Sequence, residues 1–85
     1  MKTEHELYVI LMEECGEVIK AASKRIRFGH KENDYRLDEE IGDLLCIVES
    51  LERIGKLDNK TIEDSKLKKR IKLRKWSKLP KSLLS

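Results

Sequence analysis

The sequence is poor in the residues that build strands and turns. Only 5% of its 85 residues are aromatic, and it contains one proline and four glycines. Strands are enriched in aromatic and β-branched residues, whereas 41% of the residues here are charged. This composition is typical of an all-α protein. A chain this short forms one domain at most and buries a modest core.

Long apolar runs and cysteine-rich motifs are also missing. No apolar run approaches the roughly 20 residues that cross a bilayer, so we expect no membrane association. No uninterrupted apolar segment follows the first residues, which argues against a secretory signal. Cys15 and Cys46 have no CxxC partner and fall within helical patterns. We therefore expect reduced, packed thiols and a cytoplasmic protein.

The small net charge of +3 hides a strong division along the chain. Residues 1–55 hold 8 Lys and Arg against 13 Asp and Glu, which gives −5, and residues 56–85 hold 11 against 3, which gives +8. An acidic body with a basic end suits a site that holds a metal ion and phosphates. It equally suits a basic arm that binds nucleic acid.

Hydrophobic spacing predicts three helices, over about residues 4–27, 37–54 and 59–76. The first two are long enough to form an antiparallel hairpin, and the third is basic with a thin apolar edge. We expect these helices to form a single domain over residues 1–79. Pro80 cannot continue a helix, so residues 80–85 are predicted to form a flexible C-terminal tail.

Helix ends are marked by capping residues. Thr3 is predicted to cap the first helix, with Glu6 completing a capping box. Gly29 is the expected C-terminal stop of that helix. Asp58 or Asn59 is predicted to cap the third helix.

Two acidic pairs interrupt the apolar stripes of the first two helices. Glu14 and Glu17 are three residues apart, as are Glu40 and Asp43. Acids at this spacing have Cβ atoms about 5–6 Å apart, so one cation can contact both. Two antiparallel helices would bring the pairs face to face. Carboxylates near a packing seam lose hydration, and Mg²⁺ is the usual cation for oxygen ligands that act on phosphates.

These acids carry a family resemblance. The segment Glu13–Glu17 reads EECGE and fits E-E-x-x-E, and Glu40–Asp43 reads EIGD and fits E-x-x-D, with 22 residues between them. The pattern resembles the signature of the all-α nucleoside triphosphate pyrophosphohydrolases, most closely the MazG-like branch. The resemblance covers residues 7–51 well, and the third helix only loosely, through the region of Lys66 and Arg70.

The resemblance implies an activity, a cofactor and an assembly. The family hydrolyses nucleoside or deoxynucleoside triphosphates between the α and β phosphates, with Mg²⁺ as cofactor and Mn²⁺ as a substitute. It works as a homodimer or homotetramer, so that helices of several chains complete a four-helix-type bundle. In this sequence the implied metal ligands are Glu14, Glu17, Glu40 and Asp43.

Further residues are candidates for binding substrate or assisting catalysis. Glu13 and Glu39 are candidates to orient a ligand or to act as a base toward water. Trp76 is a candidate to stack on a base, although a hydrophobic clasp is the alternative. Candidate phosphate-binding cations, for which a plain solvated surface is the alternative, are Lys24, Arg27, Lys31, Lys66 and Arg70.

Two other functions compete with this hypothesis. The basic third helix could belong to a nucleic-acid-binding module with salt-sensitive contacts, although no helix-turn-helix spacing supports nucleic acid as a partner. Within the family, a phosphoribosyl-ATP pyrophosphohydrolase or a dUTPase-like enzyme is the alternative. The sequence does not reveal base or sugar preference.

Overall fold

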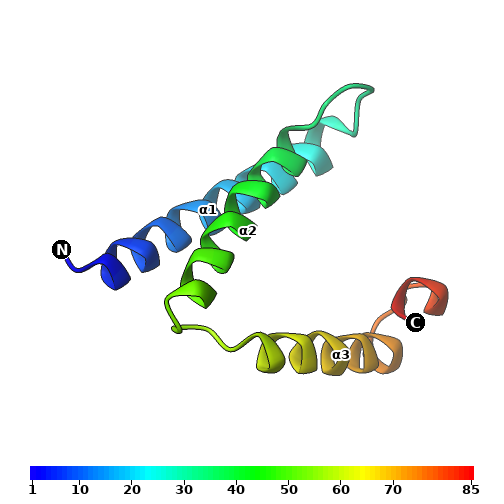
Figure 1. The fold of residues 1–85 in the computed structure, drawn as a ribbon. Coiled ribbons are helices and arrows are strands. Elements are labelled where there is room, and N and C mark those ends of the chain that lie inside the picture. Colours follow the sequence, from blue (N-terminus) through cyan, green and yellow to red (C-terminus); the bar gives the residue numbers. More distant parts are fainter.

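The protein is entirely helical, as the composition predicts. A computed structural model describes residues 1–85 and contains α1 (Thr3–Phe28), α2 (Arg36–Arg53), α3 (Asn59–Trp76) and a short 3-10 helix η1 (Lys81–Leu84). No strand is present. Figure 1 shows α1 and α2 as an antiparallel hairpin, while α3 runs away from the hairpin after a sharp change of direction. None of the helices combines the length and apolar content needed to cross a bilayer.

The core of the hairpin is a single narrow seam. Leu51 of α2 is fully buried, and Leu7, Leu11 and Val18 of α1 are half-buried along the seam. The seam is narrow because two helices cover only one stripe of each other's surface. The remaining apolar positions therefore stay accessible in one chain.

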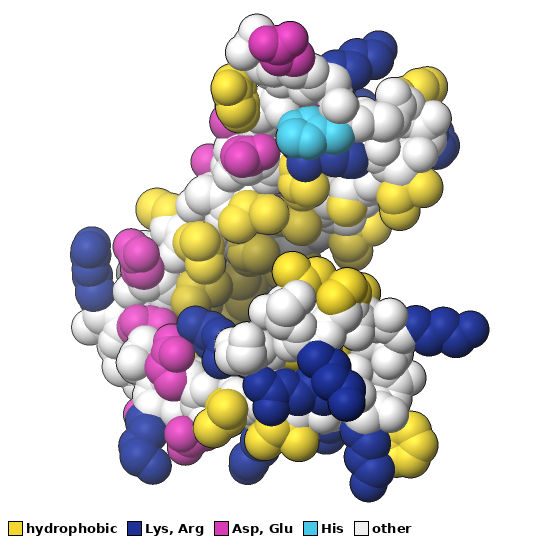
Figure 2. Space-filling model, turned by 90° about the vertical axis from the view of Figure 1, so that its right-hand side faces the viewer, with side chains coloured by type: hydrophobic (Ala, Val, Ile, Leu, Met, Phe, Trp, Pro, Cys, Tyr) yellow, Lys and Arg dark blue, Asp and Glu magenta, His cyan; other side chains and the backbone are white.

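A second apolar face lies beside the seam. Met12, Ile19 and Ile26 recur at seven-residue intervals along α1, and Ile19 and Ile26 are 70% and 85% exposed. On α2, Ile41 and Leu45 are also exposed. Figure 2 shows hydrophobic side chains along the hollow between the hairpin and the C-terminal helices. One chain thus leaves much apolar surface uncovered.

The helix ends differ in part from the sequence expectation. The predicted capping box at the start of α1 is not formed, because the helix already includes Thr3. Lys2 occupies the N-cap position and makes no side-chain hydrogen bond there. A threonine inside the first turn cannot cap that turn. Asp58 caps α3 as expected, because its Oδ2 accepts hydrogen bonds from the Thr61 backbone N–H at 3.0 Å and from Thr61 Oγ1 at 2.6 Å.

The last residues turn back onto α3. Where the sequence suggested a flexible tail, Lys81–Leu84 forms a 3-10 helix, and Leu84 is only 6% exposed. Contacts between α3 and η1 account for this burial. Pro80 does not itself end α3, which stops at Trp76 with Ser77 as its C-cap, and instead occupies the N-cap position of η1.

Candidate metal centre

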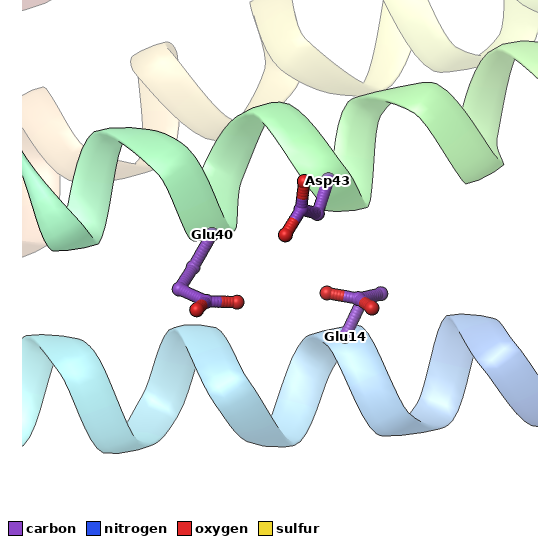
Figure 3. A group of neighbouring side chains, drawn as sticks. All are labelled: Glu14, Glu40 and Asp43. Atoms are coloured by element: carbon purple, nitrogen blue, oxygen red, sulfur yellow. The ribbon is translucent and has the colours of Figure 1, made fainter.

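Three carboxylates from two helices converge at the middle of the hairpin. Glu14, Glu40 and Asp43 each offer one oxygen, and these oxygens all lie within 4.8 Å of one another. Figure 3 shows Glu14 reaching from α1 toward α2, while Glu40 and Asp43 reach back from α2. Glu14 and Glu40 are half-buried and Asp43 is exposed, so the cluster opens toward solvent on one side.

One carboxylate oxygen of the cluster has no partner in the chain. Glu14 Oε2 is buried and has no hydrogen-bond partner. Burial, followed by the charges of Asp43 and Glu40, raises the pKa of Glu14 above its ordinary value of 4.5. An unpartnered carboxylate oxygen among other carboxylates is unfavourable in an apoprotein. Oxygen ligands that converge in this way are the donor set of Mg²⁺ and Mn²⁺, so the residues present fit a divalent ion.

Glu17, the fourth expected ligand, is not part of this group of three. Its side chain is 49% exposed, and it forms an ion pair of 3.8 Å with Lys20. It lies one turn beyond Glu14 on α1, and together with Glu40 it lines an adjoining cavity. The four acids therefore divide into three that converge and one that stands at the edge of the site.

A cavity of about 340 Å³ begins at Glu17 and Glu40 and extends toward the loop that joins the helices. It lies between the C-terminal part of α1 and the first turn of α2. Of the predicted phosphate-binding cations, Lys24 and Lys31 line it. Three cations that the sequence analysis did not select also line it, namely Lys20, Arg25 and Arg36.

The loop beside this cavity is fixed by one aspartate. Asp34 accepts hydrogen bonds from Arg36 Nε at 3.0 Å, from Arg36 Nη2 at 3.1 Å and from the Arg36 backbone N–H at 3.3 Å. Arg25 Nη2 donates to the Asp34 backbone oxygen at 3.4 Å and pairs with Asp38 at 3.5 Å. The hydrogen bonds from Arg36 lower the pKa of Asp34 to about 2. These contacts tie the loop to both helices of the hairpin.

The family model for the MazG nucleotide pyrophosphohydrolase domain matches residues 2–76. The chain belongs to the MazG family. Comparison with curated proteins, and with solved structures, gave no match. Membership supports, at a coarse level, assignment of this MazG domain as a hydrolase. It also extends the similarity across α3, beyond the residues 7–51 that the motifs cover.

The remaining residues predicted to bind substrate or assist catalysis in this MazG domain lie outside the three-carboxylate cluster. Glu13 and Glu39 are exposed. Arg27 does not line the cavity and instead stacks on Phe28, with its guanidinium carbon 5.3 Å from the ring centre. Within one chain, the candidates on α3 make no hydrogen bond or ion pair with the acids. These candidates are Lys66, which pairs with Glu63 at 3.1 Å, Arg70, and Trp76, which is 78% exposed.

Three of the five cavity cations were not predicted from the sequence, for an identifiable reason. In the sequence, Lys20 and Arg25 resemble ordinary surface cations of a helix. Whether they line a cavity depends on how the loop places α2 against α1. Arg36 did carry a signal, because an aspartate two residues earlier, just before a helix, is typical of a turn with a side-chain to backbone hydrogen bond.

Proposed function

We propose that this MazG domain is a Mg²⁺-dependent nucleoside triphosphate pyrophosphohydrolase. Its substrates would be nucleoside or deoxynucleoside triphosphates, cleaved between the α and β phosphates to the monophosphate and pyrophosphate. The observation that carries the proposal is the cluster of Glu14, Glu40 and Asp43, in which a buried Glu14 oxygen lacks any partner. Family membership supports the same reaction class.

Glu14, Glu40 and Asp43 would hold the ion, and Mn²⁺ would fit the same oxygen ligands. Glu17 would become a fourth ligand if its exposed side chain broke its ion pair with Lys20. When bound, Mg²⁺ neutralises phosphate charge and lowers the pKa of a bound water. By holding the ion, the three carboxylates would determine where the phosphates of the substrate bind.

Glu13 and Glu39 stand next to the metal-binding acids in the sequence and are exposed. We assign to one of them the role of base. Its carboxylate oxygen would take a proton from the attacking water while a new P–O bond forms. The phosphoanhydride bond between the α and β phosphates breaks in the same reaction, and pyrophosphate leaves with the bonding electron pair.

The proposal includes a cytoplasmic homodimer or homotetramer. The exposed face of Met12, Ile19 and Ile26 on α1 and of Ile41 and Leu45 on α2 is the surface that a second hairpin would cover. Two hairpins packed in this way give a four-helix bundle. Because α3 projects away from its own hairpin (Figure 1), Lys66, Arg70 and Trp76 would reach the acids of another chain. Sedimentation at micromolar concentration tests this assembly, and a monomer would contradict it.

The activity is tested with a panel of nucleoside and deoxynucleoside triphosphates, dUTP and phosphoribosyl-ATP included, assayed with Mg²⁺ for pyrophosphate release and product identity. We expect turnover of at least one substrate and its loss in Glu40→Gln. Glu49→Gln is the matched control, because it removes an exposed acid of α2 that lies outside the cluster. Absence of turnover for every substrate, or full turnover by Glu40→Gln, would contradict the proposal.

Nucleic-acid binding by α3 makes a different prediction. It would persist when the acids of the hairpin are replaced, and it would weaken steeply with salt. The same variants therefore distinguish the two functions.

A further inference from the structure

The cavity between the ends of α1 and α2 has a charge that the metal centre does not use. Glu17 and Glu40 line one end of it, and Asp34, which is paired with Arg36, lines it at the loop. The five cations that line it are Lys20, Lys24, Arg25, Lys31 and Arg36. Phe28 is the only aromatic residue that lines it. A cavity with this composition favours an anion over a nucleobase.

The cations of the cavity differ in how far they are already satisfied. Arg36 is occupied by Asp34, and Arg25 by Asp38 and the Asp34 backbone oxygen. Lys24 and Lys31 form no ion pair. Their ammonium groups are therefore available to a ligand. The first turn of α2 also lines the cavity, and the N-terminus of a helix stabilises negative charge.

The two sides of the carboxylate cluster have opposite character. On the side toward the loop lies the basic cavity. On the other side, Ile10 comes four residues before Glu14, and Ile47 comes four residues after Asp43. Because the helices are antiparallel, these two isoleucines lie at the same end of the cluster, and both are half-buried. A nucleotide bound across the cluster would thus meet apolar side chains at one end and cations at the other.

We propose that the basic cavity binds the β and γ phosphates of the substrate, and so holds the pyrophosphate product, while the nucleoside lies toward Ile10 and Ile47. This assignment rests on the proposed function and adds the direction of the substrate in the site. Lys24 and Lys31 contact the terminal phosphates. The site consequently selects triphosphates over diphosphates through these two side chains, because a diphosphate leaves part of the cavity unfilled.

The test uses the double variant Lys24→Met/Lys31→Met in the full chain, with Lys2→Met as the control. Lys2 is exposed and precedes the start of α1, at the opposite end of that helix from the cavity. Magnesium pyrophosphate binding is measured by calorimetry, which requires no turnover. Steady-state kinetics then give KM for the best triphosphate and for its diphosphate, and inhibition by the nucleoside monophosphate. Circular dichroism verifies that each variant is folded.

We expect pyrophosphate binding to weaken about tenfold or more, which is the usual effect of losing one charge-assisted hydrogen bond. KM for the triphosphate should rise by a similar factor, while inhibition by the monophosphate and the KM of Lys2→Met stay unchanged. Unchanged pyrophosphate binding, or weakened monophosphate binding instead, would overturn the assignment. Such a result with an active wild type leaves the proposed function intact, whereas an inactive wild type that still binds pyrophosphate at Lys24 and Lys31 contradicts only the function.

Discussion

Replacing Glu14 by glutamine should change thermal stability in opposite directions without and with metal. Without metal, the Glu14 carboxylate is unfavourable because burial and the neighbouring acids raise its pKa above 4.5. A raised pKa means that the folded state binds the proton more tightly than the unfolded state does. The wild type therefore loses stability as the pH rises through that raised pKa, and Glu14→Gln avoids this loss.

With metal, the balance reverses. At a Mg²⁺ concentration 100 times the dissociation constant, binding to the native state alone stabilises it by about 2.7 kcal/mol. For a domain of this size, each kcal/mol shifts Tm by about 4–8 °C, so the wild type should gain on the order of 10 °C or more. Glu14→Gln removes the half-buried carboxylate of the cluster on α1. The Tm of this variant should therefore rise little when Mg²⁺ is added. Compared with the wild type, Glu14→Gln should thus have the higher Tm in chelator and the lower Tm in Mg²⁺.

The assay is thermal unfolding followed by circular dichroism at pH 7 and at pH 4, in chelator and in Mg²⁺ or Mn²⁺, at one protein concentration. At pH 4 the advantage of Glu14→Gln in chelator should shrink, because the wild-type carboxyl is then protonated. Glu49→Gln should behave as the wild type throughout. The reasoning fails if neither ion raises the Tm of the wild type, or if Glu14→Gln is the less stable protein in chelator.

Three further predictions concern the fold and its assembly. Leu51→Ala should lower the free energy of unfolding by about 2–5 kcal/mol, measured by urea denaturation, because Leu51 is fully buried; a loss below 1 kcal/mol would contradict its core role. Asp34→Asn should flatten the acid limb of a stability–pH curve, since a pKa lowered from 3.8 to about 2 contributes stability that is present above pH 3.8 and lost as the pH falls toward 2; an unchanged acid limb would count against this. Ile19→Lys should reduce the assembly state in sedimentation and leave the helix content intact, and an unaltered assembly would place the interface elsewhere.

The cluster of three carboxylates could be predicted from the sequence because its geometry is local to each helix. The spacing of three residues places Glu40 and Asp43 on one face, and the phase of the apolar residues directs that face toward the partner helix. The spacing of the apolar residues placed Glu14 on the stripe and Glu17 beside it, and the family resemblance implied that both bind the metal. The structure separates them, because Glu14 joins Glu40 and Asp43 in the cluster, while the half-exposed Glu17 side chain pairs with Lys20.

The cavity could not be read in the same way. Its walls come from the end of α1 and the start of α2, and their mutual position depends on the seven-residue connection between Phe28 and Arg36. That connection is set by Asp34, which joins to Arg36 by its side chain and to Arg25 by its backbone oxygen. Spacing along one helix holds no information about such a contact. For this reason Lys24 and Lys31 were identified as separate candidates, but not as two walls of one site.

The division of charge along the chain links folding to function. The hairpin holds the net negative charge and α3 the positive charge, yet in one chain α3 runs away from the hairpin and does not neutralise it (Figure 1). The core of the hairpin is one narrow seam, so its free energy of unfolding is small. Repulsion among Glu14, Glu40 and Asp43 lowers that free energy further. Under the proposed assembly, a second chain would cover the exposed apolar face and bring its cations to the acids. The metal ion, the polyphosphate and the second chain would then all stabilise the hairpin around the carboxylate cluster. The isolated apoprotein should therefore be the least stable form of the molecule.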